Sequence, residues 1–591
     1  MPDTRRRSRT AEPRIREIPI NSSVSTVPWQ GPICRGSVWT PKVDTAFKLL
    51  LSFRLVSAIW SNISDCDETY NYWEPAHFML YGNGFQTWEY SPQYAIRSYA
   101  YIALHVIPIK VIRLFTAPER ILTFYFIRCV LAMVCASCET YFYRGVIKHY
   151  DASVARLTLS FMLLSTGMYI SAAAFLPSSF SMYMTLLSMG AWYSGHLPVA
   201  IISTAISAII GWPFAAVLGA PLAIDIVYRK KKPQLFVVWV IISLCLVLAP
   251  TVYYDSLMYG KRVIASLNII MYNVMTSHGP DLYGTEPWTF YFINGFLNFN
   301  FVFLLALPAI VLLYATQKYT GLKFPGIPHY IALAPMYLWI VIFFSQAHKE
   351  ERFLFPIYPL ICLSAALSLD SLQRLFSSLV GYAKHYTDFL WYIPVGIVCV
   401  SGLLSISRNL ALYHGYHAPI DIYTALNNIS SYRSIHRLRS DASVSVCMGK
   451  EWYRYPSSFF LASERWKLLF LKSEFRGQLP GRYEKGEDAM RVIPRNMNDM
   501  NKEEPSRYMD DIHCHYLIDL DTGKSTEREP DYSKNPDKYQ PILSLPFLDN
   551  ERSHKLFRAF YVPFLSDGRC TYRNYTLYQV RRPPKVKPDK V

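Results

Sequence analysis

Charged side chains are scarce in this sequence. Only 17% of its 591 residues are Asp, Glu, Lys or Arg, whereas a typical soluble protein carries about 25%. The shortage is concentrated between residues 45 and 407, and the last third of the chain is much richer in charge. A water-soluble multidomain protein is therefore excluded, and the pattern predicts a membrane domain followed by a water-exposed one.

Nucleic-acid binding is not expected either, although the formal net charge is +17. The basic residues collect at the N-terminus, in the loop Arg229–Lys232 and at the C-terminus. Such clusters are typical of cytoplasmic loops of membrane proteins, where they set the orientation of the chain. No cleavable signal peptide is expected, because residues 1–44 are basic, polar and contain proline, so the first apolar run should remain as an anchor.

The cysteines offer no metal site. Most of the 11 lie in apolar segments, where a free thiol behaves as a small apolar side chain, and neither a zinc site nor a thioredoxin motif is expected. Cys447, Cys514 and Cys570 lie in the polar tail and can include one disulfide if that tail faces an oxidising compartment. The sequence does not choose the pair.

Long apolar runs are abundant. A bilayer crossing needs about 20 helical residues, and the runs predict an all-α polytopic membrane domain with about eleven transmembrane helices. The candidate spans are Thr45–Asn62, Ala95–Phe115, Ile121–Phe142, Val154–Phe175, Ser178–Ser194, Val199–Ile226, Gln234–Tyr254, Phe290–Ala315, Tyr330–Phe344, Phe353–Leu372 and Phe389–Ile406. The second is the weakest and can lie in the membrane interface instead, because it contains four basic residues or histidines between Arg97 and Arg113.

Basic loops predict which side each segment faces. With residues 1–44 and the loop Arg229–Lys232 in the cytosol, the loops 63–94, 255–289 and 345–352 lie in the lumen. The membrane domain then covers residues 45–407, and residues 408–591 form a lumenal tail. This assignment places one basic cluster, Arg144, Lys148 and His149, in the lumen, against the same rule. We give the two larger clusters more weight.

The tail reads as a small α/β domain. Ala442–Met448, Tyr516–Leu520 and Thr576–Val580 are predicted strands, a helix is expected near Ser457–Leu471, and long loops are expected between residues 480 and 535. The glycosylation sequons at Asn428 and Asn574 suit a lumenal position.

The first lumenal loop carries unusual acids. Asp65, Asp67 and Glu68 fall within four residues at the end of a predicted span. Close carboxylates raise one another's pKa, which suits a group that accepts a proton near neutral pH. The structural alternative, a solvated helix cap made by Asp65, has about equal weight from these residues alone. Aromatic residues crowd the same loop, and they serve either an interfacial belt or stacking against sugars.

A second polar cluster lies at Gln346–Phe353, between two predicted spans. A short charged turn is the commoner explanation. His348, Lys349 and Arg352 can also neutralise a lipid-linked phosphate at membrane level, and cations there would stabilise a phosphate leaving group. The loop 255–289 can bind or gate a substrate, or can be a simple connection.

Several of these motifs together resemble glycosyltransferase family 22. The shared motifs are the acidic pair Asp67-Glu68, the segment Thr87-Trp88-Glu89 followed by Arg97-Ser98, and His348-Lys349-Glu350-Glu351-Arg352-Phe353. The resemblance covers about residues 45–407. It implies a GT-C fold and a mannosyltransferase that uses dolichyl-phosphate mannose in the endoplasmic reticulum membrane, with its active site facing the lumen.

The longer run from Asp65 to Pro75 is similar to the α-1,2 subgroup of N-glycan precursor assembly. That subgroup adds the seventh and ninth mannoses to the dolichyl-pyrophosphate-linked oligosaccharide. The resemblance also implies an inverting reaction, which needs one carboxylate base and no enzyme nucleophile. Asp67 is the predicted base, with Asp65 as the fallback and Glu68 positioning the acceptor.

The remaining site residues follow from the same resemblance. His348, Lys349 and Arg352 are expected to hold the donor phosphate. The residues expected to bind substrate are Tyr70, Trp73, Glu74, Trp88, Glu89, Arg97, Glu350 and Glu351. No cofactor is required, because the donor has a single phosphate, although the carboxylates can hold a divalent metal.

Two alternatives remain within the family: a lumenal α-1,6-mannosyltransferase of the same pathway, and one of glycosylphosphatidylinositol-anchor synthesis. Outside it, a lipid-linked sugar transporter is less favoured, because transporters place ionisable groups near the midplane and often contain repeats. A structural subunit would leave the carboxylates without a role.

Overall fold

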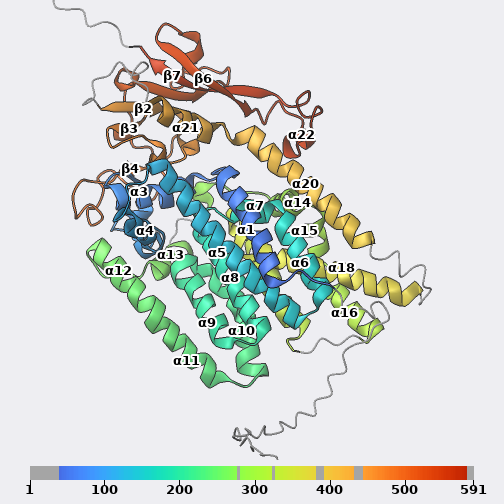
Figure 1. Cartoon of the computed structure of the whole chain (residues 1–591). Helices are drawn as coiled ribbons and strands as arrows, with labels where there is room; N and C mark the ends of the chain where they lie inside the picture. Colours follow the sequence, from blue (N-terminus) through green and yellow to red (C-terminus); the bar gives the residue numbers. More distant parts are fainter. Residues whose placement is uncertain (1–38, 276–279, 322–325, 381–391, 431–442, 582–591) are drawn as a thin grey trace, which may run out of the picture. The chain divides into compact units, whose positions relative to one another are not determined.

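The computed structural model describes residues 39–275, 280–321, 326–380, 392–430 and 443–581. Helices dominate up to residue 430, and a β-sheet follows in the tail (Figure 1). In these described ranges, four helices are long and apolar enough to cross a membrane: Arg120–His149, Pro233–Tyr259, Glu351–Leu379 and Tyr392–Tyr416. The predicted fold class, an all-α multi-pass membrane protein with a small α/β C-terminal domain, is confirmed.

A buried ion pair joins the first helix of the described residues to the first of these four long helices. Helix α1 (Val43–Trp60) packs along α5 (Arg120–His149). Arg54 donates two hydrogen bonds to the Glu139 carboxylate, at 3.0 and 2.7 Å, and both side chains are fully buried. Arg54 also donates to the carbonyl of Met162 on α6 (Ala152–Leu164) at 2.6 Å. Since breaking such a pair would strand a buried charge, it holds three helices in register.

Helix α4 (Tyr99–Arg113) occupies the weakest predicted span and does not cross the bundle. At its start, the Tyr99 hydroxyl lies 3.3 Å from the hydroxyl of Tyr483 in the tail. At its end, Arg113 lies over the ring of Tyr81, which itself packs against Phe459 of the tail. Because both ends contact the tail side of the bundle, the contacts favour the interfacial alternative for this segment.

The predicted single span Val199–Ile226 is wrong, because the chain turns back at Trp212. Helix α9 (Leu197–Ile206) continues as η3 (Ser207–Gly211), and the return leg is η4 (Pro213–Gly219), α10 (Ala220–Ile224) and η5 (Asp225–Arg229). Trp212 is extended, with φ −120° and ψ 115°. The physical reason is Pro213, which lacks an amide hydrogen and disfavours helical geometry in the residue before it.

With α4 at the interface, one predicted crossing is lost, and the return leg after Trp212 adds one, so the number of crossings is unchanged. The two changes also resolve the conflict raised by the cluster Arg144, Lys148 and His149. The indole of Trp192, near the end of α8 (Pro177–Ser194), donates to Asp225 at 2.9 Å. Lys148 donates to the carbonyl of Ser194 at 2.7 Å. The basic cluster at the end of α5 therefore lies at the same end of the bundle as the loop Arg229–Lys232, as the positive-inside rule requires.

The later helices complete the bundle. They are α11 (Pro233–Ser243), η6 (Leu244–Leu248), α12 (Ala249–Tyr259), α13 (Ala265–Met275), α14 (Phe290–Phe299), α15 (Phe301–Ala306), α16 (Ala309–Thr320), α17 (His329–Ser345), η8 (Glu351–Ile357), α18 (Tyr358–Val380) and α20 (Tyr392–Tyr416). Figure 1 shows α11 and α12 as one long rod at the edge of the bundle. The last predicted span, Phe389–Ile406, begins at residues outside the described ranges.

The tail contains a mixed five-stranded sheet. Its strands are β2 (Val444–Met448), β3 (Trp466–Phe470), β5 (Tyr516–Leu520), β6 (Tyr539–Leu548) and β7 (Tyr572–Val580), in the order β3-β2-β5-β7-β6. Strand β2 is parallel to β3 and β5, and β7 is antiparallel to β5 and β6. The three predicted strands are confirmed.

Other expectations for the tail differ from the structure. The helix expected near Ser457–Leu471 is a short 3-10 turn, η10 (Ser458–Phe460), followed by β3, in which buried and exposed residues alternate as in a half-buried strand. Helix α21 (Ala418–Ser430) and strand β6 were not predicted. Cys447 and Cys514 form a disulfide, while Cys570 is free. Cys135 and Cys138 have CxxC spacing but are buried free thiols in α5.

The tail is bound to the loop that follows α1. Strand β1 (Phe85–Gln86) of this loop pairs antiparallel with β4 (Gly481–Arg482) of the tail. The Thr69 hydroxyl donates to the carbonyl of Tyr455 at 2.9 Å, and the Tyr70 hydroxyl donates to that of Trp452 at 2.8 Å. The loop with the unusual acids is therefore held between the helices and the tail.

Candidate active site

The acidic loop begins with a capped turn. Asp65 is extended and accepts a hydrogen bond from the amide of Asp67 at 2.9 Å, so it caps the short helix α2 (Cys66–Glu68). The chain continues through a π-helical turn, η1 (Thr69–Trp73), into α3 (Glu74–Tyr81). A π-helical turn inside a helix is frequent at functional sites. The capping alternative raised for Asp65 is confirmed, and it does not exclude a chemical role.

Arg352 brings the two polar clusters of the sequence together. Its guanidinium lies 2.9 Å from a carboxylate oxygen of Asp65 and 2.6 Å from one of Asp67, and it also pairs with Glu350. The four side chains are partly exposed, from 13% for Arg352 to 35% for Asp67. Three carboxylates thus surround one cation at a place that solvent reaches.

A second arginine adjoins this group. Arg97 forms a two-pronged ion pair with Glu89, at 2.9 and 3.0 Å, and donates to the hydroxyl of Tyr72 at 2.8 Å. Both Arg97 and Glu89 were predicted site residues, whereas Tyr72 was not. The sequence held one signal for Tyr72, its place in the dense aromatic run beside the acids.

The pKa values of the two aspartates move in opposite directions. Burial raises the pKa of Asp65 to about 7, against the opposing effect of Arg352 and with help from the charges of Asp67 and Glu350. Burial acts on Asp67 in the same direction, but Arg352 and Arg97 outweigh it and lower the pKa of that carboxyl below its ordinary value. Asp67 is therefore the carboxylate that stays ionised at neutral pH.

His348 adjoins the charged group around Arg352 through Glu350. The ring nitrogens of His348 lie 2.8 Å from the carbonyl oxygen of Gly284 and 3.0 Å from Glu350, and the hydrogen bond with Glu350 raises the pKa of His348. Glu351, also a predicted site residue, accepts a hydrogen bond from the side-chain amide of Asn298 at 2.6 Å.

Four residues predicted to act at the site instead stabilise the fold. Trp73 is fully buried against Phe124 and Phe175. Tyr70 is buried and bonded to the tail. Lys349 is 6% exposed and donates to the carbonyl of Glu286 at 3.0 Å. The fourth, Glu74, is described below; direct contact of any of these four with a substrate does not fit the geometry.

Glu68 and Glu74 both point inward. Glu68 accepts hydrogen bonds from the Trp73 indole and the Phe175 amide, each at 3.0 Å, and burial raises its pKa. Glu74 is fully buried and accepts from the amide of Ser458 at 2.6 Å, the hydroxyl of Ser458 at 2.9 Å and the amide of Phe85 at 3.1 Å. The positioning role predicted for Glu68 would therefore act through the protein and not through contact with the acceptor.

Asp65, Cys66 and Asp67 place potential metal-binding atoms within 4.8 Å of one another. The guanidinium of Arg352 lies against both carboxylates. Its positive charge is thus already positioned where a divalent ion would bind, which disfavours a metal in this arrangement.

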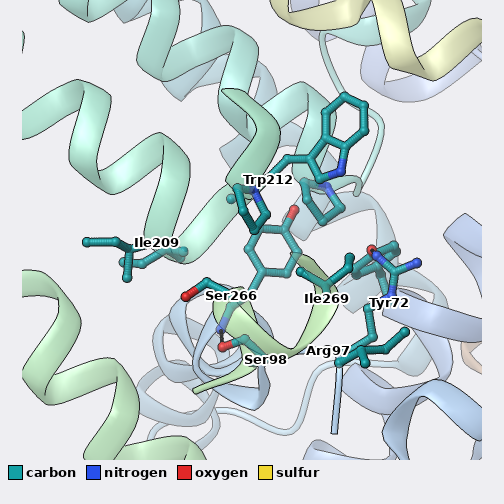
Figure 2. A pocket seen from close by; sticks show the side chains of 14 residues that line it. Tyr72, Arg97, Ser98, Ile209, Trp212, Ser266 and Ile269 are labelled. Atoms are coloured by element: carbon teal, nitrogen blue, oxygen red, sulfur yellow. Dashed lines mark hydrogen bonds between the residues drawn. The ribbon is translucent and has the colours of Figure 1, made fainter. Parts of the chain in front are cut away.

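A cavity lies beside Arg97. Polar side chains (Tyr72, Arg97, Ser98 and Ser266) and apolar ones (Ile209 and Ile269 among them) line it together (Figure 2). Trp212, at the turn between η3 and η4, covers one wall. The cavity has a volume of about 30 Å³, so a ligand larger than water would need it to widen.

Comparison with known proteins places this site in a family. The Alg9-like mannosyltransferase family matches residues 45–462. The alpha-1,2-mannosyltransferase ALG9 of Mus musculus is 52% identical over 561 residues, covering 94% of this chain and 91% of the relative. That of Saccharomyces cerevisiae is 31% identical, covering 88% and 93%.

Among solved structures, ArnT from Cupriavidus metallidurans in the apo state aligns with a TM-score of 0.47 and 14% identity, covering 90% of this chain and 97% of ArnT. The match to the family and to its curated relatives extends over the helices and through the loops that carry Asp67, Arg97 and Arg352. This chain belongs to the Alg9-like mannosyltransferase family.

Proposed function

We propose that this mannosyltransferase transfers mannose from dolichyl-phosphate mannose to the dolichyl-pyrophosphate-linked oligosaccharide of N-glycan precursor assembly, forming the α-1,2 linkages of the seventh and ninth mannoses. The observation that carries the proposal is the contact of Arg352 with two carboxylates, close to Arg97, which itself lines a small cavity. This arrangement offers a carboxylate that can act as the base and a cation that can bind a phosphate.

The reaction is a single displacement with inversion. An acceptor hydroxyl attacks the anomeric carbon of the mannose, and the bond from that carbon to the phosphate oxygen breaks. The hydroxyl proton passes to Asp67, and the bonding electrons leave with dolichyl phosphate. Arg352 stabilises the negative charge that develops on this leaving group, and His348 lies within the same charged group.

Donor binding would activate the base. In the structure Arg352 is paired with Asp67, which lowers the basicity of the carboxylate. When the donor phosphate draws the guanidinium toward itself, that stabilisation weakens and the pKa of Asp67 rises. Asp67 then becomes a better proton acceptor only when the donor is present.

The cavity of Figure 2 is the proposed place for the donor head group and the start of its isoprenoid chain. Arg97, Tyr72 and Ser98 would face the phosphate, and Ile209 the chain. Its volume, about 30 Å³, is close to that of a single water. We therefore expect α13 or η3 to move outward when the donor binds. No cofactor is required by this scheme, since Arg352 supplies the cation.

The active site is proposed to face the lumen of the endoplasmic reticulum. The acidic loop is bound to the tail, and the tail contains the Cys447–Cys514 disulfide. Disulfides persist in oxidising compartments. The basic loops at the opposite end of the bundle, including Arg229–Lys232, support a cytosolic position for that end.

Transfer by the purified protein tests the proposal. The protein in detergent or nanodiscs is incubated with radiolabelled dolichyl-phosphate mannose and with a lipid-linked glycan that lacks the seventh mannose. A labelled product that α-1,2-specific mannosidase cleaves supports the assignment. An α-1,6 product, or transfer only to a glycosylphosphatidylinositol precursor, would replace it with one of the two family alternatives, and movement of the lipid without transfer would indicate a transporter.

A further inference from the structure

A group of aromatic side chains and one carboxylate lies beside the reaction site and takes no part in the mechanism above. The Trp88 ring lies 5.2 Å from that of Tyr94 and 5.1 Å from that of Tyr272. Asp499, from the tail, accepts hydrogen bonds from the hydroxyls of Tyr94 at 3.0 Å and Tyr272 at 3.2 Å. The tail therefore contributes a charged side chain to an aromatic surface built by the membrane domain.

This surface adjoins the cavity of Figure 2 without being part of it. On α13, Ile269 lines the cavity, and Tyr272, about one helical turn further along, belongs to the aromatic group. Trp88 directly precedes Glu89, which pairs with Arg97 on the cavity wall. The aromatic group thus adjoins the proposed donor cavity at two places, along α13 and next to the Arg97–Glu89 ion pair.

Tyr283 lies near the charged group around Arg352, because the carbonyl of the next residue, Gly284, lies 2.8 Å from a ring nitrogen of His348. Its side chain is 48% exposed and hydrogen-bonds with Trp88. Burial, followed by the carboxylates of Glu89, Asp67 and Asp499, raises the pKa of Tyr283.

We propose that Trp88, Tyr283 and Asp499 form the subsite that holds the terminal mannose of the acceptor glycan. The negative face of an aromatic ring attracts the C–H face of a sugar, and a carboxylate and a phenol bind its hydroxyls. An inverting displacement requires the acceptor on the side of the anomeric carbon opposite to the phosphate, and this group adjoins the proposed donor cavity along α13 and beside Glu89. The inference rests on the proposed function, since it names the acceptor side of the same reaction.

Asp499→Asn tests the subsite with little disturbance of the fold. An asparagine can keep both tyrosine contacts, because it accepts with its oxygen and donates with its nitrogen, yet it loses the charge that would bind a sugar hydroxyl. We expect the acceptor KM to rise about tenfold, while the donor KM and the thermal midpoint in detergent stay at wild-type values. Trp88→Ala should raise the acceptor KM similarly, and Trp88→Phe should restore part of the loss.

Asp488→Asn is the matched control, because Asp488 is another carboxylate of the tail, is 74% exposed and pairs only with the exposed Arg491 among the described residues. An unchanged acceptor KM in Asp499→Asn would overturn the subsite. So would an equal rise in both KM values, which indicates a structural role. If Asp499→Asn does not accumulate as folded protein, the comparison of Trp88→Ala with Trp88→Phe decides by the same criterion. Wild-type protein that transfers no mannose to the glycan would instead refute the proposed function.

Discussion

Replacing the proposed base separates chemistry from folding. In Asp67→Asn, Arg352 keeps its ion pairs with Asp65 and Glu350. In the wild-type protein three carboxylates surround this guanidinium, so the substitution lowers an excess of negative charge and still leaves Arg352 paired with two carboxylates. We therefore expect Asp67→Asn to accumulate in the membrane with a thermal midpoint near that of the wild type.

The effect on catalysis should be large. General-base catalysis contributes about 10²–10⁴-fold, which corresponds to about 2.7–5.5 kcal/mol of transition-state stabilisation. An amide cannot accept the hydroxyl proton, so kcat should fall by that factor, while the KM for each substrate changes little. The assay is transfer of labelled mannose from dolichyl-phosphate mannose to the truncated lipid-linked glycan.

Asp65→Asn is the matched control within the same cluster. Asparagine caps helices about as well as aspartate, so α2 should persist, and kcat should fall by less than about tenfold if Asp67 is the base. A variant Asp67→Asn that retains more than a tenth of wild-type activity would refute the assignment. A larger loss in Asp65→Asn than in Asp67→Asn would transfer the role to Asp65.

Three further outcomes follow from the geometry. Burial raises the pKa of Asp65 to about 7, so its carboxyl gains negative charge as pH rises through that value and competes with the donor phosphate for Arg352. The donor KM should therefore increase between pH 6 and 8. A wild-type pH profile of the donor KM in Asp65→Asn would contradict this reasoning. Glu74→Gln should lower the free energy of unfolding by about 1–3 kcal/mol. In the wild type both carboxylate oxygens of Glu74 accept hydrogen bonds from backbone N–H groups, and the NH₂ group of glutamine would face one of these donors. Thermal unfolding in detergent measures that loss, and Glu551→Gln, at an exposed residue, is the control. An unchanged midpoint in Glu74→Gln would show that the hydrogen bonds of Glu74 to the loop and the tail do not stabilise the fold. Activity should persist in excess EDTA, because Arg352 supplies the positive charge at the phosphate; a loss that Mg²⁺ or Mn²⁺ restores would show that a metal is needed.

Much of the membrane domain follows from local properties of the sequence. Apolar runs of sufficient length form helices wherever water is absent, because each backbone group must then find its partner within the segment. Even the turn at Trp212, which the predicted span Val199–Ile226 overlooked, has a local cause in Pro213. The strands at Val444–Met448 and Tyr516–Leu520 were likewise readable from their composition.

The site itself depended on the tertiary structure. Asp67 and Arg352 are 285 residues apart in sequence, and no local pattern states that they meet at 2.6 Å. Composition also could not separate Asp67 from Glu68, although one faces the site and the other is buried behind it.

By itself, therefore, the sequence determined that the chain is a membrane protein and which loop carries its unusual acids, because hydrophobicity and proline act over short distances. The tertiary structure decided which of these acids meets a cation, which ones hold the tail, and that Asp499 reaches the aromatic group. Those outcomes depend on how helices and tail pack together, since only packing brings distant side chains within hydrogen-bonding distance.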